Sequence, residues 1–139
     1  KDKIMKTAVI YWSGTGNTEQ MAKAVAEGAN AELFTVSQFS GSVDDYDAIA
    51  FGCPAMGAEV LEEDEFEPFF TANESKLSGK KIALFGSDGW GDGEWMREWV
   101  KRCTDNGISI VTGEGLMANE SPNDDDLAKC KELGETLVK

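Results

Sequence analysis

The sequence predicts an α/β protein, in which a parallel β-sheet of five strands has helices packed on both faces. Short apolar runs alternate five times with segments whose apolar residues recur at helical spacing. Two of these runs, within residues 48–52 and 80–86, are continuously apolar, as is typical of strands buried on both faces. With 139 residues and no repeats or linkers, we expect one domain over residues 1–139, in which residues 1–4 are a ragged or engineered start.

The expected elements follow one another as strand, helix and strand along the whole chain. Strands are expected at residues 7–12, 31–36, 48–52, 80–86 and 108–111, with the last resumed at 116–118. Helices are expected at residues 18–29, 66–72, 93–106 and 122–138, with one helical turn near 43–46. Gly28 and Asn30 suit the end of the first helix.

The last helix has the clearest start signal. Ser121 is a good N-cap, Pro122 fits the first helical position, and the acidic residues 124–126 lie at the positive end of the helix dipole. The inward face of this helix is expected to carry Leu127, Cys130, Gly134 and Leu137.

The charge balance limits the classes of partner. The chain has 26 acidic and 13 basic residues, a formal net charge of −13, and no histidine. Nucleic acid and anionic membrane surfaces are therefore not expected as partners, whereas basic proteins are. Without an imidazole, catalysis by proton shuttling near neutral pH is disfavoured.

The cysteines indicate a reducing compartment. Cys53, Cys103 and Cys130 are odd in number and form no Cys-x-x-Cys pair, so we interpret them as reduced apolar residues and not as a disulfide or zinc framework. The sequence contains no signal peptide and no apolar run of about 18 residues. We therefore expect a cytoplasmic protein without a metal.

The chain is organised around the run Ser-Gly-Thr-Gly-Asn-Thr at residues 13–18, between the first strand and the first helix. Free amides and the helix dipole attract an anion there, and two glycines let the backbone curl around it. Side-chain donors of a phosphate cradle are Ser13, Thr15, Asn17 and Thr18. A P-loop would need a Lys-Ser or Lys-Thr pair, and a dinucleotide fingerprint would need glycine at Glu19. By itself, an ordinary glycine-rich turn fits these residues equally well.

Two further loops are expected beside this cradle. Residues 53–59 follow the third strand and residues 86–93 follow the fourth, and the carboxyl ends of strands 1, 3 and 4 meet at one edge of a doubly wound sheet. Met56 and Trp90 are suited to sandwich a flat ring, and Glu59 to accept a hydrogen bond from a ring N–H. Together the three loops predict a site for a phosphorylated planar heterocycle.

These motifs closely resemble those of the short-chain flavodoxins. The resemblance rests on the strand–turn–helix unit at residues 13–18, the Ala-Met-Gly turn at 55–57 and Gly-Trp-Gly at 89–91, and it extends over nearly the whole chain. It implies a flavodoxin-like three-layer sandwich with strand order 2-1-3-4-5 and noncovalently bound FMN at the switch point, an arrangement for which flavodoxin itself is the standard example.

The resemblance also implies roles for single residues, with the phosphate on the cradle. Met56 and Trp90 resemble the two walls that stack on the flavin. Glu59 resembles the acceptor for flavin N3–H, and the Gly57 carbonyl resembles the group that turns toward N5 in the semiquinone. No catalytic or metal-binding residue is expected. The expected cofactor-binding residues are Ser13, Gly14, Thr15, Gly16, Asn17, Thr18, Pro54, Ala55, Met56, Gly57, Ala58, Glu59, Asp88, Gly89, Trp90, Gly91 and, as lesser candidates, Ser87 and Asn119.

Two positions depart from the family pattern. Pro54 has no N–H donor where some relatives carry a hydroxyl residue, so we expect the phosphate to have one contact fewer. Asp88 stands where an aromatic residue often precedes Gly-Trp, which leaves the pyrimidine edge of the flavin less covered and places a charge beside it. The other tryptophans, Trp12, Trp95 and Trp99, are expected in core or helix packing.

The function implied by the resemblance is that of a monomeric, low-potential one-electron carrier. It would shuttle FMN between semiquinone and hydroquinone in place of ferredoxin, and it would not be an enzyme. Its expected partners are basic-rimmed redox enzymes, namely ferredoxin/flavodoxin-type oxidoreductases, attracted by the acidic residues at 62–67 and by Asp92. Residues 62–67 fit a solvated face equally well.

Three alternatives remain open from the sequence. An FMN-dependent NAD(P)H quinone or nitro reductase would need a basic dinucleotide pocket and usually a dimer, which the acidic composition disfavours. A phosphorylated receiver domain would need acidic residues after strand 1 and an aspartate after strand 3, where Ser13 and Cys53 stand. A flavodoxin-like protein dedicated to one enzyme fits the same residues.

Overall fold

The computed structural model describes residues 5–89 and 91–139, so residues 1–4 and Trp90 lie outside the described part, together with the prediction of a ragged start. One parallel sheet runs through the molecule in the order β2-β1-β3-β4-β5, which confirms the predicted fold class and strand order. The strands are β1 (Thr7–Tyr11), β2 (Glu32–Thr35), β3 (Ala48–Gly52), β4 (Lys81–Asp88) and β5 (Leu116–Asn119).

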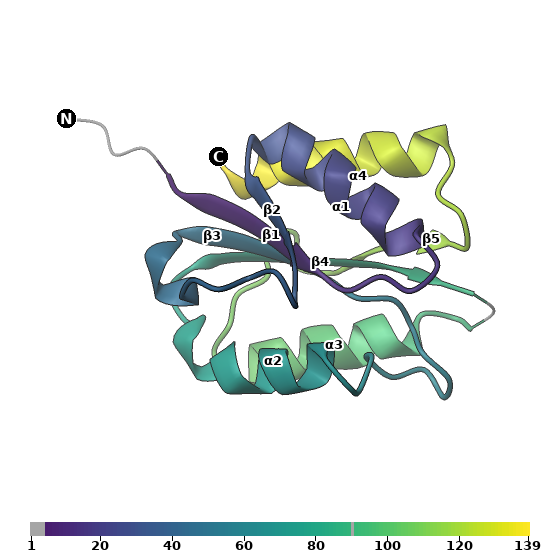
Figure 1. The fold of residues 1–139 in the computed structure, drawn as a ribbon, viewed down its shortest axis with the longest axis horizontal. Coiled ribbons are helices and arrows are strands. Elements are labelled where there is room, and N and C mark those ends of the chain that lie inside the picture. The colour runs from purple at the N-terminus through teal and green to yellow at the C-terminus, as the bar shows by residue number, and fades with distance from the viewer. Residues whose placement is uncertain (1–4, 90) are drawn as a thin grey trace.

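Helices cover both faces of the sheet, which makes three layers (Figure 1). The helices α1 (Asn17–Ala29) and α4 (Asp124–Leu137) lie on one face, and α2 (Phe66–Asn73) and α3 (Glu94–Asp105) lie on the other. The helical turn predicted near residues 43–46 is a short 3₁₀ helix, η1 (Val43–Asp45). A second one, η2 (Glu74–Lys76), continues from the end of α2.

The central strands are buried on both faces, which explains their continuously apolar sequence. Every residue of β1 and of β3 is buried. In β1, Ala8 and Ile10 belong to the core beneath α2 and α3, whereas Val9 and Tyr11 belong to the core beneath α1 and α4. Each large side chain that is fully buried contributes about 1.5–3 kcal/mol. These two cores therefore hold the strand ends, and with them the loops that follow, in fixed positions.

Two glycines let α1 and α4 pack in close contact. A Cβ at Gly28 would lie 1.9 Å from the Lys131 carbonyl oxygen, and a Cβ at Gly134 would lie 2.1 Å from the Val25 carbonyl oxygen. No larger residue fits at either position without separating the helices. Gly28 thus serves helix packing, while the predicted role at the end of α1 falls to Asn30, the C-cap, in a left-handed conformation with φ 52°.

Two strand predictions are wrong at the far side of the sheet. Of residues 108–111, only Ile110 pairs with β4, through an isolated bridge to Ile82. β5 instead begins at Leu116, where the resumed part of the strand was correctly predicted. β4 in turn runs past its predicted end, because Ser87 and Asp88 find backbone partners in β5. The sheet itself, and not a loop, therefore holds these two side chains at its carboxyl edge.

The start of α4 also differs from the prediction. The N-cap is Asn123 and not Ser121, because Asn123 and Asp126 form a capping box. The Asp126 N–H donates to Asn123 Oδ1 at 2.8 Å, and the Asn123 N–H donates to Asp126 Oδ2 at 3.0 Å. This reciprocal pair satisfies two amides, where a serine cap satisfies one. On the inward face of the helix, Leu133 is buried and Leu127 is only half-buried.

Candidate cofactor site

The loops that follow β1, β3, β4 and β5 enclose a cleft of about 280 Å³ at the carboxyl edge of the sheet. The cleft therefore brings the three sequence motifs together, as expected at a switch point. Trp90 was expected to line it as well, but that residue lies outside the described part of the chain. The lining residues are Trp12, Ser13, Gly14, Thr15, Asn17, Thr18, Pro54, Ala55, Met56, Ser87, Asp88, Gly89 and Glu120.

The first loop forms an anion cradle at the N-terminus of α1. Gly16 occupies the N-cap with φ 98°, a conformation that glycine adopts without a Cβ penalty. Ser13 Oγ accepts hydrogen bonds from the Gly16 N–H at 3.1 Å and the Glu19 N–H at 3.2 Å, so its own O–H is available to donate. The amides of Asn17 and Thr18 donate to no other described residue. These donors lie at the positive end of the helix dipole, which suits a phosphate.

Hydrogen bonds between distant segments hold the cradle against the neighbouring loops. Thr18 Oγ1 and Ser87 Oγ lie 3.0 Å apart, and both side chains are buried. The Ser87 carbonyl accepts a hydrogen bond from the Ala55 N–H at 3.0 Å. Ser87 therefore joins the start of α1, the loop after β3 and the end of β4 into one wall of the cleft.

Trp12 packs against the core beneath α2 and α3, as expected, but it is only half-buried and also lines the cleft. Its indole N–H donates to Glu65 Oε1 at 2.7 Å. A Cβ at Gly14 would lie 3.0 Å from the indole ring, so glycine at this position lets the cradle pass directly over that ring. Sequence reasoning missed this contribution, and the available signal was that Trp12 directly precedes Ser13.

The second loop is a hairpin that closes between Met56 and Val60, which exchange backbone hydrogen bonds of 2.8 and 3.1 Å. Its turn consists of Gly57, Ala58 and Glu59. Gly57 (φ 43°) and Glu59 (φ 60°) both have positive φ, which in a residue with a Cβ costs about 1–2 kcal/mol. Met56 and Val60 remain 36% and 41% exposed. Of the two, Met56 lines the cleft, where it offers an apolar surface on which a flat ring can stack.

The Glu59 carboxylate contacts the start of α3 and does not line the cleft itself. Its Oε2 accepts a hydrogen bond from the Trp95 N–H at 3.2 Å. Its Oε1 is buried and has no hydrogen-bond partner among the described residues. A Cβ at Gly91 would lie 1.4 Å from Oε1, so only glycine leaves this oxygen its space. A buried acceptor without a donor costs about 1–3 kcal/mol, and an N–H donor from a bound ligand would remove that cost.

Some expected site residues stand beside the cleft without lining it. Gly16 forms part of the turn of the cradle at the N-cap of α1, but it does not line the cleft. At the end of β5 the cleft is lined by Glu120 and not by Asn119, and both are exposed. Glu120 has φ 55°, and its N–H donates to the Asp88 carbonyl at 2.7 Å. Sequence reasoning missed Glu120 because it belongs to no motif. The described residues expected at the site that do not line the cleft are Gly16, Gly57, Ala58, Glu59, Gly91 and Asn119.

The charge around the cleft is one-sided. Among the described residues that line it, none is lysine or arginine, whereas Asp88 and Glu120 are acidic. A phosphate in the cradle would therefore be held by neutral donors and the helix dipole alone. The field of the surrounding carboxylates disfavours any further negative charge in the cleft.

Cys53 lies close to the cleft in the sequence, and its thiol is poorly suited to react. Cys53 follows β3 directly, and burial raises the pKa of its thiol to about 12, so the reactive thiolate is scarce.

In the described part of the chain, no group of His, Cys, Asp or Glu residues is arranged to hold a metal ion. None of the helices described here has the length and apolar character needed to cross a membrane.

Comparison with known sequences points to one family. The family model for flavodoxin matches residues 9–134. The flavodoxin of Megasphaera elsdenii is 48% identical over 137 residues, which cover 94% of this chain and 97% of the relative. The flavodoxin of Clostridium beijerinckii is 43% identical over 136 residues, with 94% and 97% covered.

Solved structures agree with the sequence relatives. The solution structure of two-electron reduced Megasphaera elsdenii flavodoxin matches with a TM-score of 0.80 and 43% identity, over 95% of this chain and 98% of that one. A flavodoxin from the domain Archaea matches with a TM-score of 0.86 and 25% identity, over 96% of each chain. The likeness thus covers the whole three-layer fold and not a fragment of it.

Proposed function

This chain belongs to the flavodoxin family, and we propose on that premise that it passes single electrons between redox enzymes at low potential and catalyses no reaction of its own. It is an electron carrier whose cofactor is FMN. The observation that carries the proposal is the cleft at the switch point of the sheet, where a phosphate cradle and an exposed methionine meet and where none of the described lining residues is a cation. We place the protein in the cytoplasm, because its three cysteines are buried free thiols. That it acts as a monomer is part of the same proposal.

Residues in and beside the cleft would bind different parts of FMN, which supplies the redox chemistry. Ser13 and the amides of Asn17 and Thr18 would hold the phosphate at the end of α1. The exposed Met56 would cover one face of the ring. Glu59 Oε1, which lacks a donor among the described residues, would accept from a ring N–H.

The acidic surroundings explain why the carrier would work at low potential. The formal charge of the chain is −13, and Asp88 and Glu120 line the cleft. One unit charge at about 10 Å, with an effective dielectric constant of about 20, changes the energy of an added electron by roughly 1.7 kcal/mol, or about 70 mV. A few such contributions make the fully reduced protein a strong reductant.

Stepwise reduction of the FMN-loaded protein tests this function. We expect two separate one-electron steps, the second at a much lower potential than the first. NADPH should not be consumed unless a separate oxidoreductase is added. Direct two-electron reduction by NADPH alone would refute the proposal and support a reductase instead.

The acidic run at residues 62–67, which the sequence suggested as a docking surface, is largely engaged within the chain. Glu62 is buried and accepts hydrogen bonds from the amides of the residues two, three and four positions on. Glu65 accepts from the indole in the cleft, and Glu67 pairs with an arginine on α3. Asp92 likewise pairs with an arginine of α3, at 3.2 Å. Charges that are already paired attract a partner weakly.

A groove between the hairpin and α3 is better suited to a partner. It has a volume of about 520 Å³ and shares the Met56–Val60 hairpin with the cofactor cleft as a wall. The buried Trp95 and Trp99 line it, and so do the exposed Glu94 and Glu98. Arg102 lines it as well, but its charge is already paired with Glu67 and Glu74. The remaining acidic groups and the two indoles suit both the charged head and the aliphatic stem of lysine or arginine. We therefore propose that basic-rimmed ferredoxin/flavodoxin-type oxidoreductases dock here, next to the cofactor.

Two pairs of substitutions test this docking surface. Glu94→Gln with Glu98→Gln removes two charges from the groove, and Glu132→Gln with Glu135→Gln removes two exposed charges from α4 on the opposite face of the sheet. At low salt we expect electron transfer with a ferredoxin-type oxidoreductase to slow about fivefold in the first variant and less than about twofold in the second. Native rates that do not fall as salt rises, or equal losses in both variants, would contradict docking in the groove.

A further inference from the structure

Asp88 ends β4 with its carboxylate directed into the loop that follows. The residue is only 8% exposed although it is acidic. Its Oδ1 accepts a hydrogen bond from the Gly91 N–H at 3.2 Å, and its Oδ2 accepts one from the Gly93 N–H at 3.1 Å. Its carbonyl accepts from the Glu120 N–H at 2.7 Å. Both carboxylate oxygens thus accept hydrogen bonds from backbone amides of the same loop.

The glycines that follow Asp88 need such a clamp. Gly89, Gly91 and Gly93 lose more conformational entropy on ordering than any other residue type. Gly93 has φ 92° and is the N-cap of α3, but it has no side chain with which to cap the helix. Hydrogen bonds to an ionised carboxylate are roughly twice as strong as neutral ones. The Asp88 carboxylate therefore selects one conformation of a loop that is otherwise free to adopt many.

We propose that Asp88 is a positioning residue for FMN, in that its carboxylate fixes the glycine-rich loop in the shape that borders the ring of the cofactor. Asp88 and Gly89 line the cleft, and the step from loop to ring rests on the proposed function together with the expected stacking of the ring between Met56 and Trp90. The sequence suggested a different role, that of a charge beside the ring. The two roles have opposite consequences, since removal of a simple charge strengthens binding of an anionic cofactor, whereas loss of the clamp weakens it.

The substitution Asp88→Asn separates the two roles, because asparagine has the same size but only one acceptor oxygen. Asp92→Asn is the matched control, since it removes the same charge from an exposed side chain that faces Arg97. In Asp88→Asn we expect the Kd to rise about tenfold, equivalent to 1.4 kcal/mol, for FMN and equally for riboflavin, which lacks the phosphate. In Asp92→Asn both constants should stay within about twofold of the native values.

Amide exchange in the FMN-loaded native protein tests the clamp without a substitution. The Gly91 and Gly93 amides should be protected, and they should exchange faster in Asp88→Asn than in Asp92→Asn. Unprotected amides in the native protein, or an unchanged or lower Kd for both ligands in Asp88→Asn, would overturn the positioning role. A loss of FMN affinity with unchanged riboflavin affinity would overturn the placement of the ring beside this loop, on which the role rests. A native protein that passes electrons only in two-electron steps would refute the proposed function while leaving the binding data unchanged.

Discussion

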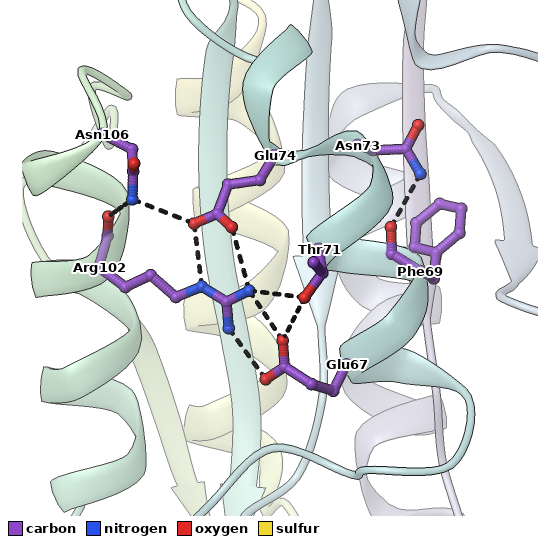
Figure 2. A network of polar contacts seen from close by, with 7 residues as sticks. All are labelled: Glu67, Phe69, Thr71, Asn73, Glu74, Arg102 and Asn106. Carbon is purple, nitrogen blue, oxygen red and sulfur yellow. Dashed lines mark hydrogen bonds and ion pairs between the residues drawn. The ribbon is translucent and has the colours of Figure 1, made fainter.

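Two polar regions of the molecule differ in how many of their hydrogen bonds the chain completes by itself. The Arg102 cluster, made of Arg102, Glu67, Thr71, Glu74 and Asn106, joins α3 to α2 and η2 (Figure 2). The guanidinium donates to Glu74 at 2.9 Å, to Glu67 at 2.9 Å and to Thr71 at 3.1 Å. Asn106 donates to Glu74 at 3.3 Å. Both carboxylates of this cluster therefore have donors within the protein.

The cofactor cleft and the Met56–Val60 hairpin beside it have polar groups without partners among the described residues. The Ser13 hydroxyl accepts two hydrogen bonds but can still donate one. The amides of Asn17 and Thr18 have no acceptor among the described residues, and Glu59 Oε1 has no donor there. Buried polar groups are otherwise nearly always paired. The paired groups thus hold two helices together, whereas the unpaired groups gathered at the carboxyl edge of the sheet surround the cleft in which we place the ligand.

Breaking the paired region should have the largest effect. Arg102→Met keeps a long apolar side chain beside the Phe70 ring but leaves Glu67 and Glu74 without their cation. Because these carboxylates are 36% and 17% exposed, water screens part of the cost, and we expect the free energy of unfolding to fall by about 2 kcal/mol. Urea denaturation measures this change. The Kd for FMN should not change, and a shift of more than about threefold would show that the two regions are not independent.

A substitution in the cofactor cleft should have the opposite effects, with a large change in the Kd for FMN and a smaller change in stability. Ser13→Ala removes a donor to the phosphate and the acceptor for the Gly16 and Glu19 amides. We expect the Kd for FMN to rise about tenfold, while the free energy of unfolding falls by about 1 kcal/mol through the lost cap. Riboflavin, which has no phosphate, serves as the control and should bind as before. Equal losses for both ligands would mean that Ser13 does not contact the phosphate.

A smaller effect should follow from weakening the support beneath the cradle. Trp12→Phe keeps an aromatic ring under Gly14 but removes the N–H that donates to Glu65. Since this hydrogen bond is solvent-exposed, we expect only about a threefold rise in the Kd for FMN. Titration of the FMN-free protein with FMN measures it. An unchanged Kd would show that the bond to Glu65 does not position the cradle.

Lowering the pH should produce the smallest of the expected effects, a loss of stability through Glu67 in the Arg102 cluster. Burial alone would raise the pKa of Glu67, but hydrogen bonds from Arg102 and Thr71 and the charge of Arg102 hold that pKa below its ordinary value of 4.5. A lowered pKa contributes stability that is present above the ordinary value and is lost as the pH falls through the folded value. Urea denaturation at a series of pH values below 4.5 should therefore show a steeper loss for the native protein than for Arg102→Met. Parallel pH profiles would contradict this account of Glu67.

The sequence by itself determined the central strands β1 and β3 and the cradle, because their signals are local. The apolar runs of β1 and β3 predict strands buried on both faces, and both are fully buried. The turn at residues 13–18 predicts an anion site from the amides and hydroxyls of a single strand-to-helix junction, and these residues line the cleft except Gly16, whose positive φ shapes the turn. Such features depend on neighbours within one helical turn, which a sequence displays directly.

Only the tertiary structure decided which polar groups stayed free for a ligand. Trp12 and Glu65 are 53 positions apart, and Thr18 and Ser87 are 69 positions apart. Asp88 looked like a charge beside the cofactor, yet it occupies both its oxygens with loop amides. Pairing of this kind depends on where both partners lie after the sheet has brought the loops together. No periodicity or composition encodes it, because a carboxylate that is paired and one that is free have the same letter in the sequence.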